Sequence, residues 1–214
     1  MKFFNLITLA SLVTAVPQFR RQESVTGTIK GSVDALADTA LTTLTIIENS
    51  LATLKNTTRG TEDSVEAQIA VKSSIEAITD AVEVATTQIV RVTTGAVGNV
   101  GGRAGGLSAR EVLELTTALR RTIGTFEDIL GTISGVLKDL TPEVLATVQD
   151  EITALRGSIN PLLRPLLLFT AAVRNASNGL VGGVVRGLDS AFTNLIQLQR
   201  DLVTDIGVPA MGGL

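Results

Sequence analysis

Four residue types are missing from this chain: Cys, His, Trp and Tyr. Without His or Cys, the usual zinc sites, Ser-His-Asp triads and Cys-His nucleophiles are excluded. With Phe as its sole aromatic residue, the chain offers few surfaces on which sugars or bases can stack. The formal net charge of −3 also argues against a nucleic-acid partner. We therefore expect no enzyme, no catalytic residues, no metal or other cofactor, and no nucleic-acid binding.

Long apolar runs are also lacking beyond the N-terminus. The first 15 residues combine a basic start at Lys2, a short apolar run and a small-residue end at Ala15. This pattern is typical of a secretory signal peptide that is cleaved after Ala15. Residues 16–21 end in a dibasic pair and resemble a pro-segment that secretory proteases remove after Arg21. No later segment has the roughly 20 apolar residues that a membrane span needs. The sequence thus predicts a product that is secreted into the medium or the cell wall, with no transmembrane segment.

Apolar residues recur at every third or fourth position through the rest of the chain, which indicates amphipathic helices. We find no convincing alternation typical of strands. The predicted helices span about 24–54, 61–92, 107–140, 142–159 and 180–206. The fold class is therefore predicted to be all-α, a bundle of five to six amphipathic helices. Its domain covers residues 22–206, and residues 207–214 form a flexible tail. An extended coiled coil is the alternative, but short turns at 55–60 and 140–141 favour helices that fold back.

Each of the first two helices is predicted to bury a continuous apolar stripe, as is the third. In the first helix the stripe consists of Val25, Ile29, Val33, Leu36, Ala40, Leu44, Ile47, Leu51 and Leu54. In the second it consists of Val65, Ile69, Ile75, Ile78, Val82, Ala85, Ile89 and Val92. Pro161 and Pro165 are expected to interrupt the fourth helix, since proline lacks the amide proton and crowds the preceding turn. Residues 162–173 would then form a separate or kinked segment, the most apolar of the mature chain.

The third helix has a clear predicted start. Ser108 and Glu111 stand at the positions of a capping box, and Leu107 and Val112 at those of a hydrophobic staple. Six glycines lie just before it, within residues 95–106. Their spacing fits neither common phosphate-binding loop, so we interpret this segment as a flexible hinge near the middle of the chain.

Two sequons, at Asn56 and Asn175, lie in predicted turns between helices. Because the chain is predicted to be secreted, we expect N-glycosylation at both.

Small residues also interrupt the apolar helices. They leave two interpretations open, which are close helix–helix approach and a cavity that a lipid tail fills. In the second case, the expected apolar lining is Phe126, Gly131, Leu166, Phe169 and Phe192. The carboxylates fall at helix starts or on polar faces, where solvated charge is the preferred explanation.

A family resemblance rests on three stretches: Leu107-Ser-Ala-Arg-Glu-Val112, the apolar spacing from Val144 to Leu155, and the tail from Ala172 to Phe192. Together with the signal peptide and the absence of Cys, they resemble the fungal cell-wall galactomannoprotein and hydrophobic-surface-binding protein family. The resemblance implies a helical bundle without catalysis that binds lipids or hydrophobic surfaces at the cell wall, with cell-wall polysaccharide as a further partner through its glycans. The alternative function is a structural or host-interaction protein whose helices pair with a partner.

Overall fold

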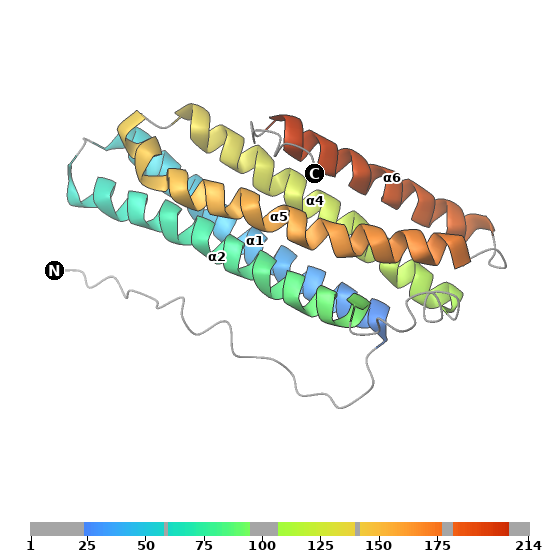
Figure 1. Cartoon of the computed structure of the whole chain (residues 1–214). Helices are drawn as coiled ribbons and strands as arrows, with labels where there is room; N and C mark the ends of the chain where they lie inside the picture. Colours follow the sequence, from blue (N-terminus) through green and yellow to red (C-terminus); the bar gives the residue numbers. More distant parts are fainter. Residues whose placement is uncertain (1–23, 58–59, 95–106, 140–141, 177–181, 206–214) are drawn as a thin grey trace.

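The computed structural model describes residues 24–57, 60–94, 107–139, 142–176 and 182–205. Within these ranges the chain forms five helices and no strand: α1 (Val25–Asn56), α2 (Glu62–Thr94), α4 (Ala109–Asp139), α5 (Pro142–Ala176) and α6 (Gly182–Asp205). In Figure 1, α1, α4 and α6 run in one direction, and α2 and α5 run in the opposite one. The prediction of an all-α bundle is confirmed.

Several predicted features lie outside the described residues. They are the processing sites at Ala15 and Arg21, the glycine-rich segment 95–106 and the tail 207–214.

The helices begin where the capping residues predict. The Ser108 amide donates to Glu111 Oε2 over 2.8 Å, and the Glu111 amide donates to Ser108 Oγ over 3.3 Å. Leu107 packs against the core, and Val112 is fully buried, as a hydrophobic staple requires. At the start of α1, Ser24 Oγ accepts from the Gly27 amide over 3.0 Å. These contacts satisfy amides that have no partner within their helices.

Buried threonines are accommodated by hydrogen bonds to their own helices. Thr79, Thr93, Thr116 and Thr122 each donate to the carbonyl four residues earlier, over 2.7–3.0 Å. Such a bond satisfies the hydroxyl inside the core while the methyl group packs against apolar neighbours. A threonine-rich sequence can therefore form helices with polar residues on their buried faces.

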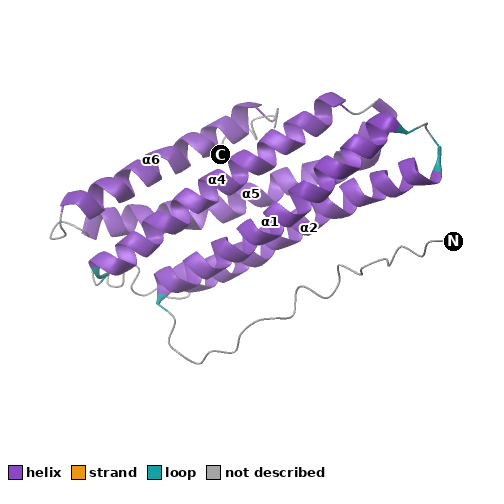
Figure 2. Cartoon of the chain, turned by 180° about the vertical axis from the view of Figure 1, so that it is seen from behind, coloured by secondary structure: helices purple, strands orange, loops and turns teal. Residues whose placement is uncertain are grey.

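The bundle is built around the α1–α2 pair. α4 packs along α1, and α5 packs along α2. α4 and α5 barely touch each other, and α6 lies against both of them. Figures 1 and 2 show α6 at the edge of the molecule opposite α2. In a four-helix bundle, α4 and α5 would pack directly against each other. Here α6 packs against both of them and covers that side of the core.

The predicted stripe of α1 is confirmed, since its seven central members from Ile29 to Leu51 are all at most 8% exposed. The start of the α2 stripe is wrong. Val65 and Ile69 are 48% and 59% exposed, whereas Ala67 and Val71 are buried. Counting back from Ile75 by threes and fours leads to Val71, Ala67 and Ser64, all of them buried. The core-facing positions of the first two turns hold small residues, and the larger apolar residues lie on the solvent-exposed face. The positions of the large apolar residues therefore predict the wrong buried face there.

Residues 162–173 do not form a segment separate from the fourth helix. α5 is one helix of 35 residues that contains both Pro161 and Pro165. Each proline leaves the carbonyl four residues earlier, in Gly157 and Pro161, without its helical partner. Both of these residues are exposed, so water can hydrate the two carbonyls. The apolar residues of 162–173 continue the buried face of α5, and their packing maintains the helix through the prolines.

Candidate functional site

The five predicted lining residues do not lie together. Phe126, Leu166 and Phe169 belong to one continuous core and are 0%, 0% and 3% exposed. Phe192 is half-buried on α6. Gly131 is exposed on α4, and a Cβ atom built there would meet no atom within 4 Å. Gly131 therefore neither lines the core nor permits a close approach between helices.

The apolar seam is the region where α6 covers the gap between α4 and α5. The apolar residues of α6 recur at three and four positions, and five of them are buried: Leu188, Ala191, Leu195, Leu198 and Leu202. Burial of one leucine side chain contributes about 1.5–3 kcal/mol. Apolar packing is thus the main force that holds α6 on the bundle.

A small cluster at the outer edge of this seam ties α6 to α5. Arg174 Nε donates to Asp189 Oδ1, and the two side chains are 37% and 43% exposed. The guanidinium carbon of Arg174 also lies 4.6 Å from the centre of the Phe192 ring. Exposed ion pairs contribute roughly 0–1 kcal/mol, and exposed cation–π contacts about 0.5–1 kcal/mol. The cluster therefore orients α6 more than it stabilises it.

Thr170 differs from the other buried threonines. Its residue is fully buried, and its hydroxyl has no hydrogen-bond partner within the described part of the chain. It precedes Arg174, which pairs with Asp189 of α6, by one helical turn, so the two residues share a face of α5. An unpaired buried hydroxyl costs about 1–3 kcal/mol. The seam therefore contains a polar group that this closed arrangement leaves unsatisfied.

On the α4 side of the seam, Thr116 lies opposite Gly187 of α6. A Cβ atom on Gly187 would lie 3.7 Å from Thr116 Cγ2 and 3.9 Å from Arg120 Nη2. These are ordinary van der Waals distances, so α6 and α4 approach closely here without crowding.

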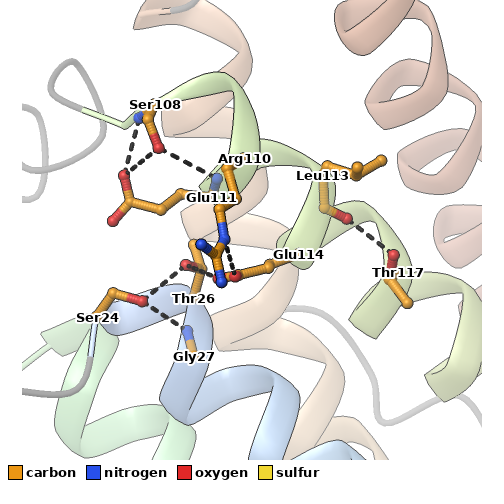
Figure 3. Close-up of polar contacts among 9 residues, drawn as sticks. All are labelled: Ser24, Thr26, Gly27, Ser108, Arg110, Glu111, Leu113, Glu114 and Thr117. Atoms are coloured by element: carbon orange, nitrogen blue, oxygen red, sulfur yellow. Dashed lines mark hydrogen bonds and ion pairs between the residues drawn. The ribbon is translucent and has the colours of Figure 1, made fainter.

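Polar side chains join α1 and α4 at their N-terminal ends and further along the two helices. At their N-terminal ends, Thr26 Oγ1 donates to Glu114 Oε2 over 3.2 Å, and Arg110 Nε donates to the other oxygen of that carboxylate (Figure 3). Further along, Arg121 of α4 pairs with Asp34 and Asp38 of α1, at 3.2 and 2.7 Å. These contacts tie α4 to α1, on the side away from α6.

A groove of about 520 Å³ lies between the C-terminal part of α1 and α4. It is lined by Glu48, Leu51, Ala52, Lys55, Asn56, Gly131, Thr132 and Gly135. Asn56, a predicted glycosylation site, is exposed at this groove, and its Nδ2 donates to the Ala52 carbonyl over 2.9 Å. Asn175, the second predicted site, is exposed at the end of α5. Neither position is obstructed by packing.

Sequence reasoning did not single out Arg174, Asp189, Thr170 or Thr116. Thr170 and Arg174 have the four-residue spacing of residues that share a helix face, which is the one signal the sequence offers. Their significance depends on α6, and spacing within one helix does not reveal which other helix covers it.

Comparisons of the chain with protein-family models, with curated proteins and with solved structures found no match. Within the described ranges, no helix combines the length and the apolarity that crossing a bilayer requires. In the same part of the chain, no group of three or more acidic side chains is placed to hold a metal ion.

Proposed function

We propose that this chain is a secreted, non-enzymatic helical protein of the cell wall or culture medium that binds lipids or apolar surfaces. The observation that carries this proposal is the apolar seam, where α6 fills the space between two helices that barely touch each other. An apolar region closed by one amphipathic helix can be made available without unfolding the α1–α2 pair. The signal-peptide pattern and the family resemblance support the same function.

Glycans at Asn56 and Asn175 belong to this proposal. Both residues are exposed. Their side chains can carry sugars without disturbing the core, and these sugars would keep the protein among the polysaccharides of the wall.

The test is adsorption to alkyl-coated silica beads, with bare silica as the control surface. We expect the secreted protein to be depleted from solution by the alkyl-coated beads only. A matched variant replaces three exposed leucines, Leu41, Leu113 and Leu168, with serine. It should adsorb like the parent if the seam is responsible. Equal adsorption to both kinds of bead would contradict the proposal, and loss of adsorption in the variant would assign it to the outer surface.

Palmitate tests the lipid form of the proposal. A ligand at a hundredfold excess over its Kd stabilises the folded state by about 2.7 kcal/mol. For a chain of this size, that corresponds to a rise in Tm of roughly 5–10 °C. Calorimetry with and without palmitate measures this rise. Adsorption to the beads without a palmitate effect would restrict the function to extended apolar surfaces.

A second candidate function is helix pairing with a partner protein. The observation that favours it is the pair Val65 and Ile69, which are exposed one turn apart on α2. The double variant Val65→Ser, Ile69→Ser should abolish any self-association that sedimentation detects in the parent. Sedimentation as a monomer before and after the change would remove self-pairing from consideration.

A further inference from the structure

α6 shares less contact with the rest of the bundle than any other described helix. At 24 residues it is also the shortest, against 31–35 for the other four. α1 and α2 pack along each other, and each also carries one further helix, whereas α6 packs mainly on α4 and α5. The loss of α6 would leave α4 on α1 and α5 on α2.

Polar contacts also join other pairs of helices within the described residues. Arg121 joins α4 to two carboxylates of α1, and Ser32 Oγ of α1 donates to Gln88 Oε1 of α2 over 2.7 Å. At the α5–α6 contact, the Arg174–Asp189 pair is more than a third exposed on both sides. Water can replace this pair when the helices separate, so it resists separation weakly.

Two features of the seam itself favour separation. The Thr170 hydroxyl is buried without a partner among the described residues, on the face of α5 that carries Arg174, and it would gain hydrogen bonds to water if the departure of α6 uncovers this face. α6 also contains Gly182, Gly183 and Gly187 in its first two turns. Glycine has low helix propensity, so the helical form of this part of α6 depends on its packing against the bundle.

We propose that α6 is a lid, which separates from α4 and α5 as one unit and exposes the seam to an extended apolar surface. This inference rests on the proposed function and specifies how the seam becomes accessible. The buried stripe of α6 runs from Leu188 to Leu202, about 21 Å at 1.5 Å per residue. On α5, Leu163 and Leu166 lie on the same face as Thr170, two turns and one turn before it, and are fully buried. Such long apolar bands fit an alkyl surface better than a small enclosed ligand.

The first test locks the lid with a disulfide. The natural chain has no Cys, so the double variant Thr116→Cys, Gly187→Cys can form one disulfide only. A Cβ atom on Gly187 would lie 3.7 Å from Thr116 Cγ2, so the two new side chains would be in contact across the α4–α6 interface. We expect the oxidised variant to adsorb to alkyl-coated beads at least tenfold more slowly than the same variant after reduction. Equal rates for the two forms would overturn the lid as the route of binding.

The second test needs no surface. In hydrogen exchange of the parent, the free energy of the opening that exposes the α6 amides should be lower than the free energy for the amides of α1 and α2. Thr170→Val removes the unpaired hydroxyl and should slow exchange in α6 alone, whereas Asp189→Asn should accelerate it. Uniform exchange along all helices, unchanged in both variants, would overturn the lid even if the protein adsorbs. If the parent fails to adsorb, the proposed function fails, and hydrogen exchange still decides whether α6 opens.

Discussion

Glu151 is the acidic member of an ion pair that joins α5 to α2. Its Oε1 lies 2.9 Å from Lys72 Nζ, and its side chain is only 11% exposed. The hydrogen bond from Lys72 lowers the pKa of Glu151 below its ordinary value of 4.5, although burial opposes this. The same bond, together with the charge of Glu151, raises the pKa of Lys72 above 10.5. Both shifts mean that the folded protein favours the charged forms.

This pair predicts a pH-dependent stability. A lowered carboxyl pKa contributes stability that is complete above the unfolded value of 4.5 and is lost as the pH falls through the folded pKa. We expect Glu151→Gln to lower Tm at pH 7, and the difference from the parent to shrink as the pH falls from about 5 to 3. The raised pKa of Lys72 contributes stability that is complete below 10.5 and is lost as the pH rises above that value, through the folded pKa. Thermal melts of both proteins across pH 3–7 measure the effect. A constant difference would show that the pair's charge does not contribute.

Gly131 carries the second prediction at the scale of single residues. Because nothing lies within 4 Å of a Cβ atom there, Gly131→Ala should improve helix propensity without crowding. The expected gain is about 0.5–1 kcal/mol, or a rise in Tm of roughly 1–4 °C. Gly27→Ala is the control, since its Cβ atom would lie 3.0 Å from Ser24 Oγ. Destabilisation by Gly131→Ala would show that another helix approaches this position after all.

At the scale of the helices, existence and starting points could be predicted from the sequence. The capping residues Ser24 and Ser108 make local hydrogen bonds, so adjacent residues contain the information. The face of a helix was harder to assign where small residues pack, as at Ala67 in α2. The continuity of α5 could not be predicted, because local chemistry argues against it and packing along the whole helix decides the outcome.

The prolines of α5 give a prediction at this scale. Pro161→Ala restores an amide donor for the Gly157 carbonyl and removes the ring that crowds it. We expect a stabilisation of about 1–3 kcal/mol, seen as a higher midpoint of urea unfolding. Pro165 is buried, so Pro165→Ala also loses packing and should gain less. A lower midpoint for Pro161→Ala would indicate that the packing of α5 requires the geometry that this proline imposes.

At the scale of the whole molecule, the bundle could be predicted but the order of its helices could not. Every helix has one apolar face, and several pairings would bury those faces equally well. The separation of α4 and α5 by α6 depends on side-chain shapes along three helices at once. For the same reason, the sequence grouped Phe126, Gly131, Leu166, Phe169 and Phe192 as one apolar lining, whereas the structure buries Phe126, Leu166 and Phe169 in the core and leaves Gly131 exposed. Thr170 was not indicated by the sequence.

The same arrangement predicts that the bundle does not unfold as a single unit when α6 is weakened. Leu195 of α6 and Ile78 of α2 are both fully buried, so truncation of either to Ala should cost about 2–5 kcal/mol. Ile78 lies in the α1–α2 pair, and Ile78→Ala should lower the midpoint of urea unfolding without changing the slope m. Leu195→Ala should also lower m, because a species without docked α6 becomes populated before the rest unfolds. Circular dichroism during urea unfolding of both variants measures m. An unchanged m in Leu195→Ala would mean that α6 unfolds together with the other helices.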